Sequence, residues 1–286
     1  HKKQIQNRFT GDDISILDDF DTIRKMCPVT CTNNADYVMT QTKDFDSKYI
    51  LKKPQNYDGE DSINVVVDLH GRGSSAQKHY EFTKLKDHVD SKNFILITPD
   101  APEKGLYKNL SSWNAKGRFD SQSDDVEYLK NIVNDVKKYY KVKDVFATGH
   151  SNGARMIQHA MCETSDTERI FKKIVPISGI YTDAHTCKNP GFDSHIIMGD
   201  SDPIVANMSK DMFGTASSEY GAIETQKLIV PDGVNIDETV TIVRNHGHCY
   251  PNGSTCRNVG DLKVGPINKK WSSASDLPDF VLSKMF

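Results

Sequence analysis

A serine stands between two glycines in the stretch "ATGHSNGARM", residues 147–156. An apolar run precedes this stretch and a helical pattern follows it, which is typical of a nucleophile elbow, the sharp strand-to-helix turn that exposes a reactive serine. Gly149 and Gly153 suit such a turn because a β-carbon at either position would collide with the neighbouring strand or helix. The pattern therefore predicts that Ser151 is a nucleophile, and an ordinary tight turn is the alternative interpretation.

A serine hydroxyl needs a general base to take its proton and a carboxylate to orient that base. In hydrolases with this elbow the acid and then the histidine follow the serine along the chain. The run "SHIIMGDSDPIV" offers Asp202 as the acid, with Asp200 as the alternate. The run "TIVRNHGHCYP" offers His248 as the base, and we expect His246 to bond nearby backbone. The same two histidines could instead bind a metal, but no third ligand stands at an obvious spacing, so we expect no metal.

The oxyanion that forms during acyl transfer needs N–H donors that are already in place. Asn152, the residue after the serine, supplies one, and we expect Arg72 in "LHGRG" to supply the other. The run "GRGSSA" at 71–76 also fits a dinucleotide-binding turn, with Asp100 at the end of the next strand as the ribose ligand. We favour the oxyanion hole, which explains these glycines without a nucleotide, and predict no cofactor.

The elements that must position these residues are short apolar runs, rich in β-branched residues, that alternate with amphipathic stretches. The stretch 123–140 places apolar residues at helical spacing behind a Ser-Asp pair that can cap its first turn. Such alternation predicts a parallel sheet, with the chemistry at the carboxyl ends of its strands. The expected buried strands are 63–71, 93–100, 144–151, 173–179 and 194–200.

The 286 residues suffice for one large α/β domain. We place this catalytic domain at 48–286 and set residues 1–47, which are polar and acid-rich, apart as an N-terminal arm of unclear role. A formal net charge of −3 argues against a nucleic-acid partner. No apolar run approaches the roughly 20 residues that a membrane helix needs, so we expect neither a nucleic-acid nor a membrane partner, and a monomer.

Six cysteines, an even number, favour a disulfide-bonded protein, and none of them forms a C-x-x-C pair. Two close pairs, in "CPVTC" and "CYPNGSTC", are spaced for small bridged loops. Together with three N-x-S sequons, the cysteines favour a secreted protein, and a cytosolic enzyme with reduced thiols is the alternative. The sequons lie at Asn109, Asn207 and Asn252.

Several of these stretches, in order from about Tyr49 to Tyr250, resemble the secreted esterases that include feruloyl esterases and polyhydroxybutyrate depolymerases. The S-N-G-A-x-M run at the elbow, with Cys162-Glu163 after it, is more specific than the elbow alone. The resemblance implies an α/β-hydrolase fold, with a mostly parallel central sheet and helices on both faces. It also implies the triad and the oxyanion hole named above. The similar stretches are "VVVDLHGRGSS", "ITPDAP", "SSWN", "SDDVEYLKNIV", "GHSNGARMIQHAMCE", "IVPISG", "GDSDPIV" and "GHCYP".

The chain departs from this family on the walls of the site. Tyr250 replaces a tryptophan that often follows the base, and Arg72 stands where many members have cysteine. These differences leave the acyl preference open. Trp113 and Tyr250 are candidates for an aromatic wall against a flat acyl group, although core packing is the alternative for Trp113. His150, beside the nucleophile, is a third candidate for binding substrate.

Two disulfide pairings follow as hypotheses. Cys162 and Cys187 flank the "IVPISG" strand, so a bridge between them is expected. A bridge between Cys249 and Cys256 would then hold the loop that bears His248.

The sequence thus predicts a secreted serine hydrolase that cleaves carboxylic esters through an acyl-serine intermediate. By resemblance, feruloyl esters of plant cell-wall polysaccharides are the first substrate choice. A polyhydroxybutyrate or other polyester depolymerase and an acetylxylan esterase are the alternatives. An inactive hydrolase fold used as a binding protein is a remote one.

Overall fold

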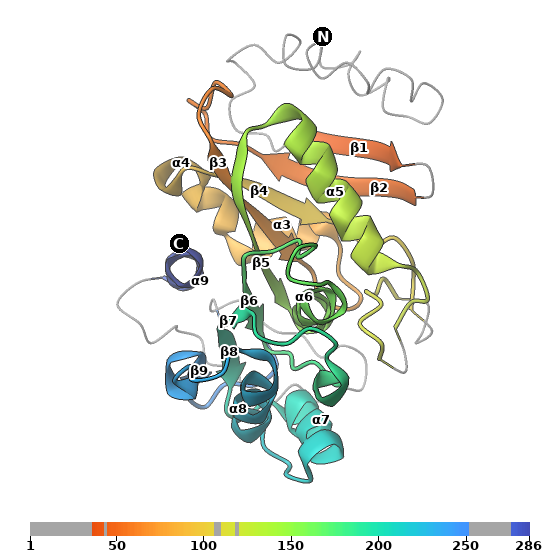
Figure 1. Ribbon diagram of the computed structural model, residues 1–286, viewed down its shortest axis with the longest axis vertical. Helices are drawn as coiled ribbons and strands as arrows, with labels where there is room; N and C mark the ends of the chain where they lie inside the picture. The colour runs from red at the N-terminus through yellow and green to blue at the C-terminus, as the bar shows by residue number, and fades with distance from the viewer. Residues whose placement is uncertain (1–35, 43–44, 106–109, 118–119, 252–275) are drawn as a thin grey trace.

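The computed structural model describes residues 36–42, 45–105, 110–117, 120–251 and 276–286, with side chains from Tyr49 onwards. At its centre the described strands form one twisted sheet in the order β1-β2-β4-β3-β5-β6-β8-β9, with the short β7 paired to β6 (Figure 1). All pairings from β4 to β9 are parallel, and the β1–β2 and β2–β4 pairings are antiparallel. The strands are β1 (Asp36–Thr42), β2 (Phe45–Lys52), β3 (Ile63–Leu69), β4 (Phe94–Pro99), β5 (Val142–His150), β6 (Lys173–Ile177), β7 (Asp193–Ser194), β8 (Ile196–Gly199) and β9 (Val240–Val243).

Helices cover both faces of this sheet (Figure 1). On one face α5 and α6 pack against the core, and on the other α3 and α9 do so. The mostly parallel sheet with helices on both faces, and the strands expected at its centre, are confirmed. The helices are α3 (Ala76–Thr83), α4 (Val89–Lys92), α5 (Asp125–Tyr139), α6 (Asn152–Glu163), α7 (Pro203–Phe213), α8 (Ser218–Ile229) and α9 (Leu277–Met285), with 3₁₀ turns η2 (Leu85–His88), η3 (Ala184–Thr186) and η4 (Ile236–Glu238).

The core follows from the two-residue period of the strands. Along β3, Val65 and Val67 belong to the cluster under α5 and α6, whereas Val66 between them belongs to the cluster under α3 and α9. A strand that is buried on both faces reads as a nearly continuous apolar run, which is why three valines follow one another in "INVVVDL". The parallel strands from β4 to β9 place the loops that leave their carboxyl ends at the same edge of the sheet.

The two helices beside the elbow begin as the sequence indicates. Asp124 caps α5, because its side chain accepts the backbone N–H of Glu127 at 3.1 Å. Helix α6 starts at Asn152, directly after Ser151, and nearly all of its residues are buried. This helix therefore lies against the sheet along its whole length and holds the elbow in place.

The sheet extends into the segment that the sequence analysis sets apart as an N-terminal arm. Strand β1 and the start of β2 lie within residues 36–47, and β2 pairs with β4 from Tyr49 to Lys52. Residues 36–42 and 45–47 therefore belong to the sheet of the catalytic domain. Residues 1–35 lie outside the described residues, so their separate role stays a prediction.

The predicted bridge between Cys162 and Cys187 is present, and it ties the end of α6 to the turn after η3. Cys249 is also disulfide-bonded, and its predicted partner Cys256 lies outside the described residues. Of the three sequons, Asn207 is exposed on α7, and Asn109 and Asn252 fall outside the described residues.

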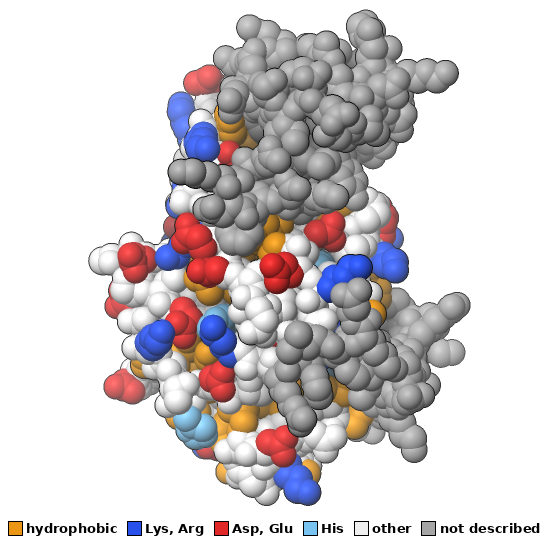
Figure 2. Space-filling model, turned by 90° about the vertical axis from the view of Figure 1, so that its right-hand side faces the viewer, with side chains coloured by type: hydrophobic (Ala, Val, Ile, Leu, Met, Phe, Trp, Pro, Cys, Tyr) orange, Lys and Arg blue, Asp and Glu red, His pale blue; other side chains and the backbone are white. Residues whose placement is uncertain are grey.

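Acidic and basic side chains are interspersed over the face shown in Figure 2, with apolar side chains between them. This face therefore carries no patch of a single charge sign among its described residues. No helix in the described ranges is long and apolar enough to cross a membrane.

Candidate active site

Ser151 lies at the tip of a strained turn between β5 and α6. Its backbone has φ 56° and ψ −114°, which non-glycine residues rarely adopt. The backbone N–H of Ser151 donates to the carbonyl of Ile177 at the end of β6, at 2.9 Å. The neighbouring strand thus holds the strained residue, and its hydroxyl is left at the carboxyl edge of the sheet.

The flanking glycines are required by close backbone contacts. A β-carbon at Gly149 would lie 2.8 Å from the carbonyl carbon of Gly153. One at Gly153 would lie 2.4 Å from the carbonyl oxygen of Leu69 in β3. Both distances are below any real contact of a β-carbon, so the steric reason for the two glycines holds in the structure.

A chain of hydrogen bonds joins the three residues that the sequence proposes as a triad. The Ser151 Oγ lies 2.7 Å from His248 Nε2, and His248 Nδ1 lies 2.8 Å from Asp202 Oδ2. The Nδ1–H donates to the carboxylate, so Nε2 is free to accept the serine proton. The structure therefore brings together residues that are separated by 97 and 46 positions in the chain.

Asp202 is placed by the helix that it starts. Its Oδ1 accepts the backbone N–H groups of Ile204 and Val205, each at 3.0 Å, and so caps α7. The other oxygen is left for His248. The alternate acid, Asp200, accepts from the Ser201 hydroxyl and from the backbone N–H of His246, so it lies outside the hydrogen-bonded triad.

Two further histidines hold the loop of the base. His150 Nε2 donates to the backbone carbonyl of His248 at 3.0 Å, and His246 Nε2 donates to that of Cys249 at 2.9 Å. Burial, followed by the charge of His248, lowers the pKa of His150 well below its usual value, so the ring stays neutral. The sequence analysis proposes that His150 binds substrate, but in the structure its Nε2 donates to the backbone carbonyl of His248. His246 bonds backbone, as expected.

The two proposed oxyanion donors lie beside the nucleophile. A β-carbon at Gly71 would lie 3.4 Å from Ser151 Cβ, so the chain entering Arg72 passes directly against the elbow. Asn152 is the first residue of α6. Among the described residues, the backbone N–H groups of Arg72 and Asn152 donate no hydrogen bond. Two unused donors next to a serine suit an oxyanion.

A buried carboxylate that the sequence analysis did not single out lies behind these donors. Asp120 is fully buried, and its Oδ1 accepts from the Arg72 guanidinium and, at 3.2 Å, from Asn152 Nδ2. No spacing signal marks it, because its partners are 48 and 32 positions away in the chain.

The proposed aromatic wall is not supported, because both of its members are buried. Trp113 has no exposed surface, its indole N–H donates to the carbonyl of His70 at 2.9 Å, and its ring packs against Tyr128. Tyr250 is 1% exposed and packs against Phe82. The core-packing alternative therefore holds for Trp113, since a ring without exposed surface cannot stack on a substrate.

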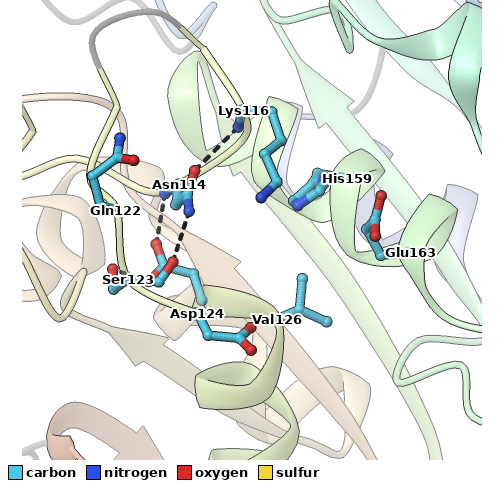
Figure 3. A pocket seen from close by; sticks show the side chains of 9 residues that line it. Asn114, Lys116, Gln122, Ser123, Asp124, Val126, His159 and Glu163 are labelled. Atoms are coloured by element: carbon cyan, nitrogen blue, oxygen red, sulfur yellow. Dashed lines mark hydrogen bonds between the residues drawn. The ribbon is translucent and has the colours of Figure 1, made fainter.

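A cavity of about 340 Å³ lies between the start of α5, the preceding loop and the second half of α6 (Figure 3). No residue of the proposed triad lines it. On the loop side, Asn114 donates its backbone N–H to Asp125 at 2.6 Å and its side-chain amide to the carbonyl of Ser123 at 2.7 Å. These bonds anchor the loop that carries Trp113 and Asp120.

The turn that resembled a dinucleotide site is built for other contacts. Asp100 accepts the backbone N–H of Ala76 at 2.6 Å, at the start of α3. His70 Nδ1 donates to the carbonyl of Gly71 at 2.8 Å, and its Nε2 accepts the N–H of Ala101 at 3.1 Å. Asp100, the acid that would bind a ribose in a dinucleotide site, thus bonds to the backbone at the start of α3.

Residues 113–229, less than half of the chain, match a family of α/β-hydrolases of unknown function, DUF915. No curated protein matches the sequence. A mutant of the feruloyl esterase module from Clostridium thermocellum, complexed with sinapinate, is similar in structure at 15% identity, with a TM-score of 0.54 over 78% of this chain and 83% of that one.

Two other solved structures are also similar in fold at low sequence identity. Poly(aspartic acid) hydrolase-1 from Sphingomonas sp. KT-1 has 13% identity and a TM-score of 0.54 over 76% of this chain and 94% of that one. A thermostable esterase has 15% identity and a TM-score of 0.50 over 75% of this chain and 55% of that one. At such identities a likeness establishes the fold alone. Together with the sheet order and the elbow, it shows that the chain has the α/β-hydrolase fold, as the resemblance in its sequence implied.

Proposed function

We propose that this protein hydrolyses carboxylic esters through an acyl-serine intermediate. The observation that carries the proposal is the hydrogen-bonded chain from Ser151 through His248 to Asp202 at a strained elbow. The side chains of His248 and Asp202 are 10% and 0% exposed, so their bond is shielded from water.

In the acylation step, His248 Nε2 takes the hydroxyl proton as Ser151 Oγ attacks the ester carbonyl carbon. The carbonyl π electrons move to oxygen, and this oxyanion accepts the N–H groups of Arg72 and Asn152. Asp202 stabilises the imidazolium that has formed. When the intermediate collapses, the bond to the alcohol oxygen breaks and His248 gives its proton to the leaving alcohol.

Water then repeats the sequence on the acyl-serine. His248 takes a proton from water as the water oxygen attacks the acyl carbon, and the same two N–H groups donate hydrogen bonds to the second oxyanion. Collapse releases the carboxylic acid, and the proton returns to Ser151 Oγ. The cycle uses water, the side chains of Ser151, His248 and Asp202, and the backbone N–H groups of Arg72 and Asn152.

Feruloyl and related hydroxycinnamoyl esters of plant cell walls are our first substrate class. The sequence motifs support it, and the fold shared with the feruloyl esterase module is compatible with it. We also propose that the protein acts outside the cell, because the bridged Cys162, Cys187 and Cys249 suit an oxidising compartment. That it acts there as a monomer remains our expectation.

Short-chain acyl esters, such as those of acetylxylan or polyhydroxybutyrate, are the second candidate class. The burial of Trp113 and Tyr250 favours this class, since neither ring offers a surface on which a cinnamoyl group could stack. A small acyl group does not need such a surface.

The test is a panel of methyl ferulate, p-nitrophenyl acetate and methyl 3-hydroxybutyrate at neutral pH, with Ser151→Ala as the blank. Serine-dependent release of ferulate, detected by chromatography, would support the first class. Release from the two short esters alone would support the second. No serine-dependent release from any ester, together with no labelling of Ser151 by a fluorophosphonate probe, would contradict the proposal and favour a hydrolase fold used for binding.

A further inference from the structure

Asp120 connects the two residues that offer the oxyanion donors. Its Oδ1 contacts the side chains of Arg72, from the loop after β3, and Asn152, from the first turn of α6. Its Oδ2 accepts the backbone N–H groups of Ala115 at 3.2 Å and Gly117 at 2.8 Å. A single buried carboxylate therefore ties three segments of the chain to one point behind the elbow.

We propose that Asp120 is a positioning residue that aims the backbone N–H groups of Arg72 and Asn152 at the substrate carbonyl. The inference rests on the proposed function, because an oxyanion hole has a role only if Ser151 attacks a carbonyl. Asp120 touches neither Ser151 nor His248, so it acts through the two donors.

The Asn152 side chain is held on every side. Its Oδ1 accepts the backbone N–H of Trp113 at 2.7 Å and the hydroxyl of Ser112 at 3.2 Å, while its Nδ2 donates to the carbonyl of Trp113 and to Asp120. Because both ends of the amide are used, the side chain has one orientation. The first turn of α6, including the Asn152 backbone N–H, is oriented with it.

Arg72 depends on Asp120 more strongly, because it lies in the loop between β3 and α3, outside any helix or strand. Its side chain is 26% exposed, and its guanidinium contacts Asp120 and, at 3.4 Å, the hydroxyl of Ser112. Among the described residues these contacts are what restrains the Arg72 side chain. The peptide that carries the Arg72 N–H is also held through the Gly71 carbonyl, which accepts from His70 Nδ1 at 2.8 Å and from the backbone N–H of Ser74 at 3.1 Å. The link to Asp120 adds the restraint that fixes this peptide from the Arg72 side.

The surrounding charges explain why a carboxylate is needed here. Arg155 Nη1 lies 3.5 Å from Asp120 Oδ2, and its side chain is 6% exposed. A β-carbon at Gly117 would lie 2.7 Å from both Asp120 and the Arg155 guanidinium, so the cluster is closely packed. Removal of the carboxylate would leave Arg155 as a buried cation without its ion pair, which is costly. Tests of Asp120 must therefore separate positioning from folding.

The experiment compares three variants in the full chain. Asp120→Asn removes the charge and keeps the shape, and Arg72→Ala removes the tethered side chain and keeps the backbone donor. Asp125→Asn is the matched control, because Asp125 is also buried, belongs to the same segment and accepts a backbone N–H, but contacts neither donor residue.

The readouts are kcat and KM for p-nitrophenyl acetate, Kd for phenylboronic acid, which forms a tetrahedral adduct on the serine, and Tm. We expect Asp120→Asn and Arg72→Ala each to lower kcat about 10- to 100-fold, because a donor misplaced by about 1 Å costs that much. The boronate affinity should fall by the same factor, with KM within threefold of wild type. Asp125→Asn should lower Tm and leave kcat within threefold.

Two further variants sharpen the test. The double variant of Asp120→Asn and Arg72→Ala should lose no more kcat than the more damaging single variant, because both single variants already remove the ion pair between Arg72 and Asp120. Arg72→Lys should recover part of the loss of Arg72→Ala, because an ammonium can reach the same carboxylate. If Asp120→Asn does not fold, the comparison of Arg72→Ala with Arg72→Lys still tests the inference.

Unchanged kcat and boronate affinity in Arg72→Ala, or equal losses in Asp120→Asn and Asp125→Asn, would overturn the inference. If the wild type shows no Ser151-dependent ester cleavage, the proposed function has failed. The inference is then judged from the amide ¹⁵N shifts of Arg72 and Asn152. Shifts that move in Asp120→Asn and stay in Asp125→Asn support it, and shifts unchanged in both overturn it.

Discussion

The two carboxylate oxygens of Asp202 bind different partners, His248 and the first turn of α7. One oxygen orients the imidazole, and the other accepts two backbone N–H groups at the helix start. The positive end of the helix dipole lies beside the carboxylate and interacts favourably with its negative charge.

Asp202→Asn separates these two tasks. Asn caps a helix about as well as Asp, so we expect Tm to change by little. An amide can present its N–H to His248 and impose the wrong tautomer, so kcat should fall by about 10³- to 10⁴-fold. Asp200→Asn is the matched control, and we expect its kcat to stay within threefold. The acid assignment would be wrong if the two variants lost activity equally in a p-nitrophenyl acetate assay.

Gly153→Ala should unfold the elbow. The added β-carbon would lie 2.4 Å from the carbonyl of Leu69, which cannot retreat without moving β3. We expect a loss of more than about 3 kcal/mol in the free energy of unfolding, measured in urea. Gly214→Ala adds its β-carbon in open space at φ 76°, so it should cost only about 1 kcal/mol. A similar loss in both variants would argue against the steric reason.

The stability of the protein should depend on pH through His70. Burial lowers the pKa of His70 to about 4, whereas an unfolded histidine titrates near 6.5. The unfolded chain therefore binds the proton first, and stability falls as the pH drops from about 6.5 towards 4. Between pH 7.5 and pH 5 this residue should account for about 2 kcal/mol of the loss. In urea titrations, the free energy of unfolding of His70→Asn should therefore fall by about 2 kcal/mol less than that of the wild type between pH 7.5 and pH 5. An unchanged pH dependence in this variant would contradict the burial argument.

Replacing Cys162 and Cys187 together by alanine should reduce stability and spare activity. The bridge closes a loop of 25 positions, for which the chain-entropy account gives about 3 kcal/mol. It lies at the far end of α6 from Ser151, so kcat should stay within threefold. Urea unfolding and ester turnover check the two halves of this prediction, and a large loss of kcat would show that the bridge bears on the elbow.

Trp113→Phe and Tyr250→Phe should differ in stability. The first removes the bond from the indole to His70 and leaves a cavity, which should cost about 1–3 kcal/mol. The second removes a buried hydroxyl that has no hydrogen-bond partner among the described residues, so stability should be unchanged or slightly higher. Neither should change KM for aryl esters. A rise in KM for Trp113→Phe would restore its place on the substrate wall.

Backbone sterics and strand periodicity made much of the fold predictable. Gly149 and Gly153 signal a close approach of backbone that few residues tolerate, and the short β-branched runs in β3 and β5 favour buried strands. The order of Ser151, Asp202 and His248 follows from where parallel strands end. These features are local in the sequence or set by topology.

Side-chain direction was not predictable, because it depends on contacts between distant segments. An aromatic residue after a strand reads the same whether it faces a substrate or the core, and the Asn152 amide and the His70 carbonyl turn Trp113 inwards. Asp120 is one of several acids in a polar run, and only its folded position reveals its partners. The pairing of β1 with β2 was missed because the polar, acid-rich sequence there lacks the apolar runs of the central strands.

The spacing between the acid and the base is set by the sheet. Strands β8 and β9 are hydrogen-bonded neighbours, from Ile196 with Val240 to Gly199 with Val243. Helices α7 and α8 leave the sheet after β8 and return at β9. This excursion can therefore change in length beyond the first turn of α7 while Asp202 and His248 keep their distance. The helical pair is thus a part of the chain in which insertions or deletions leave the spacing of the catalytic acid and base intact.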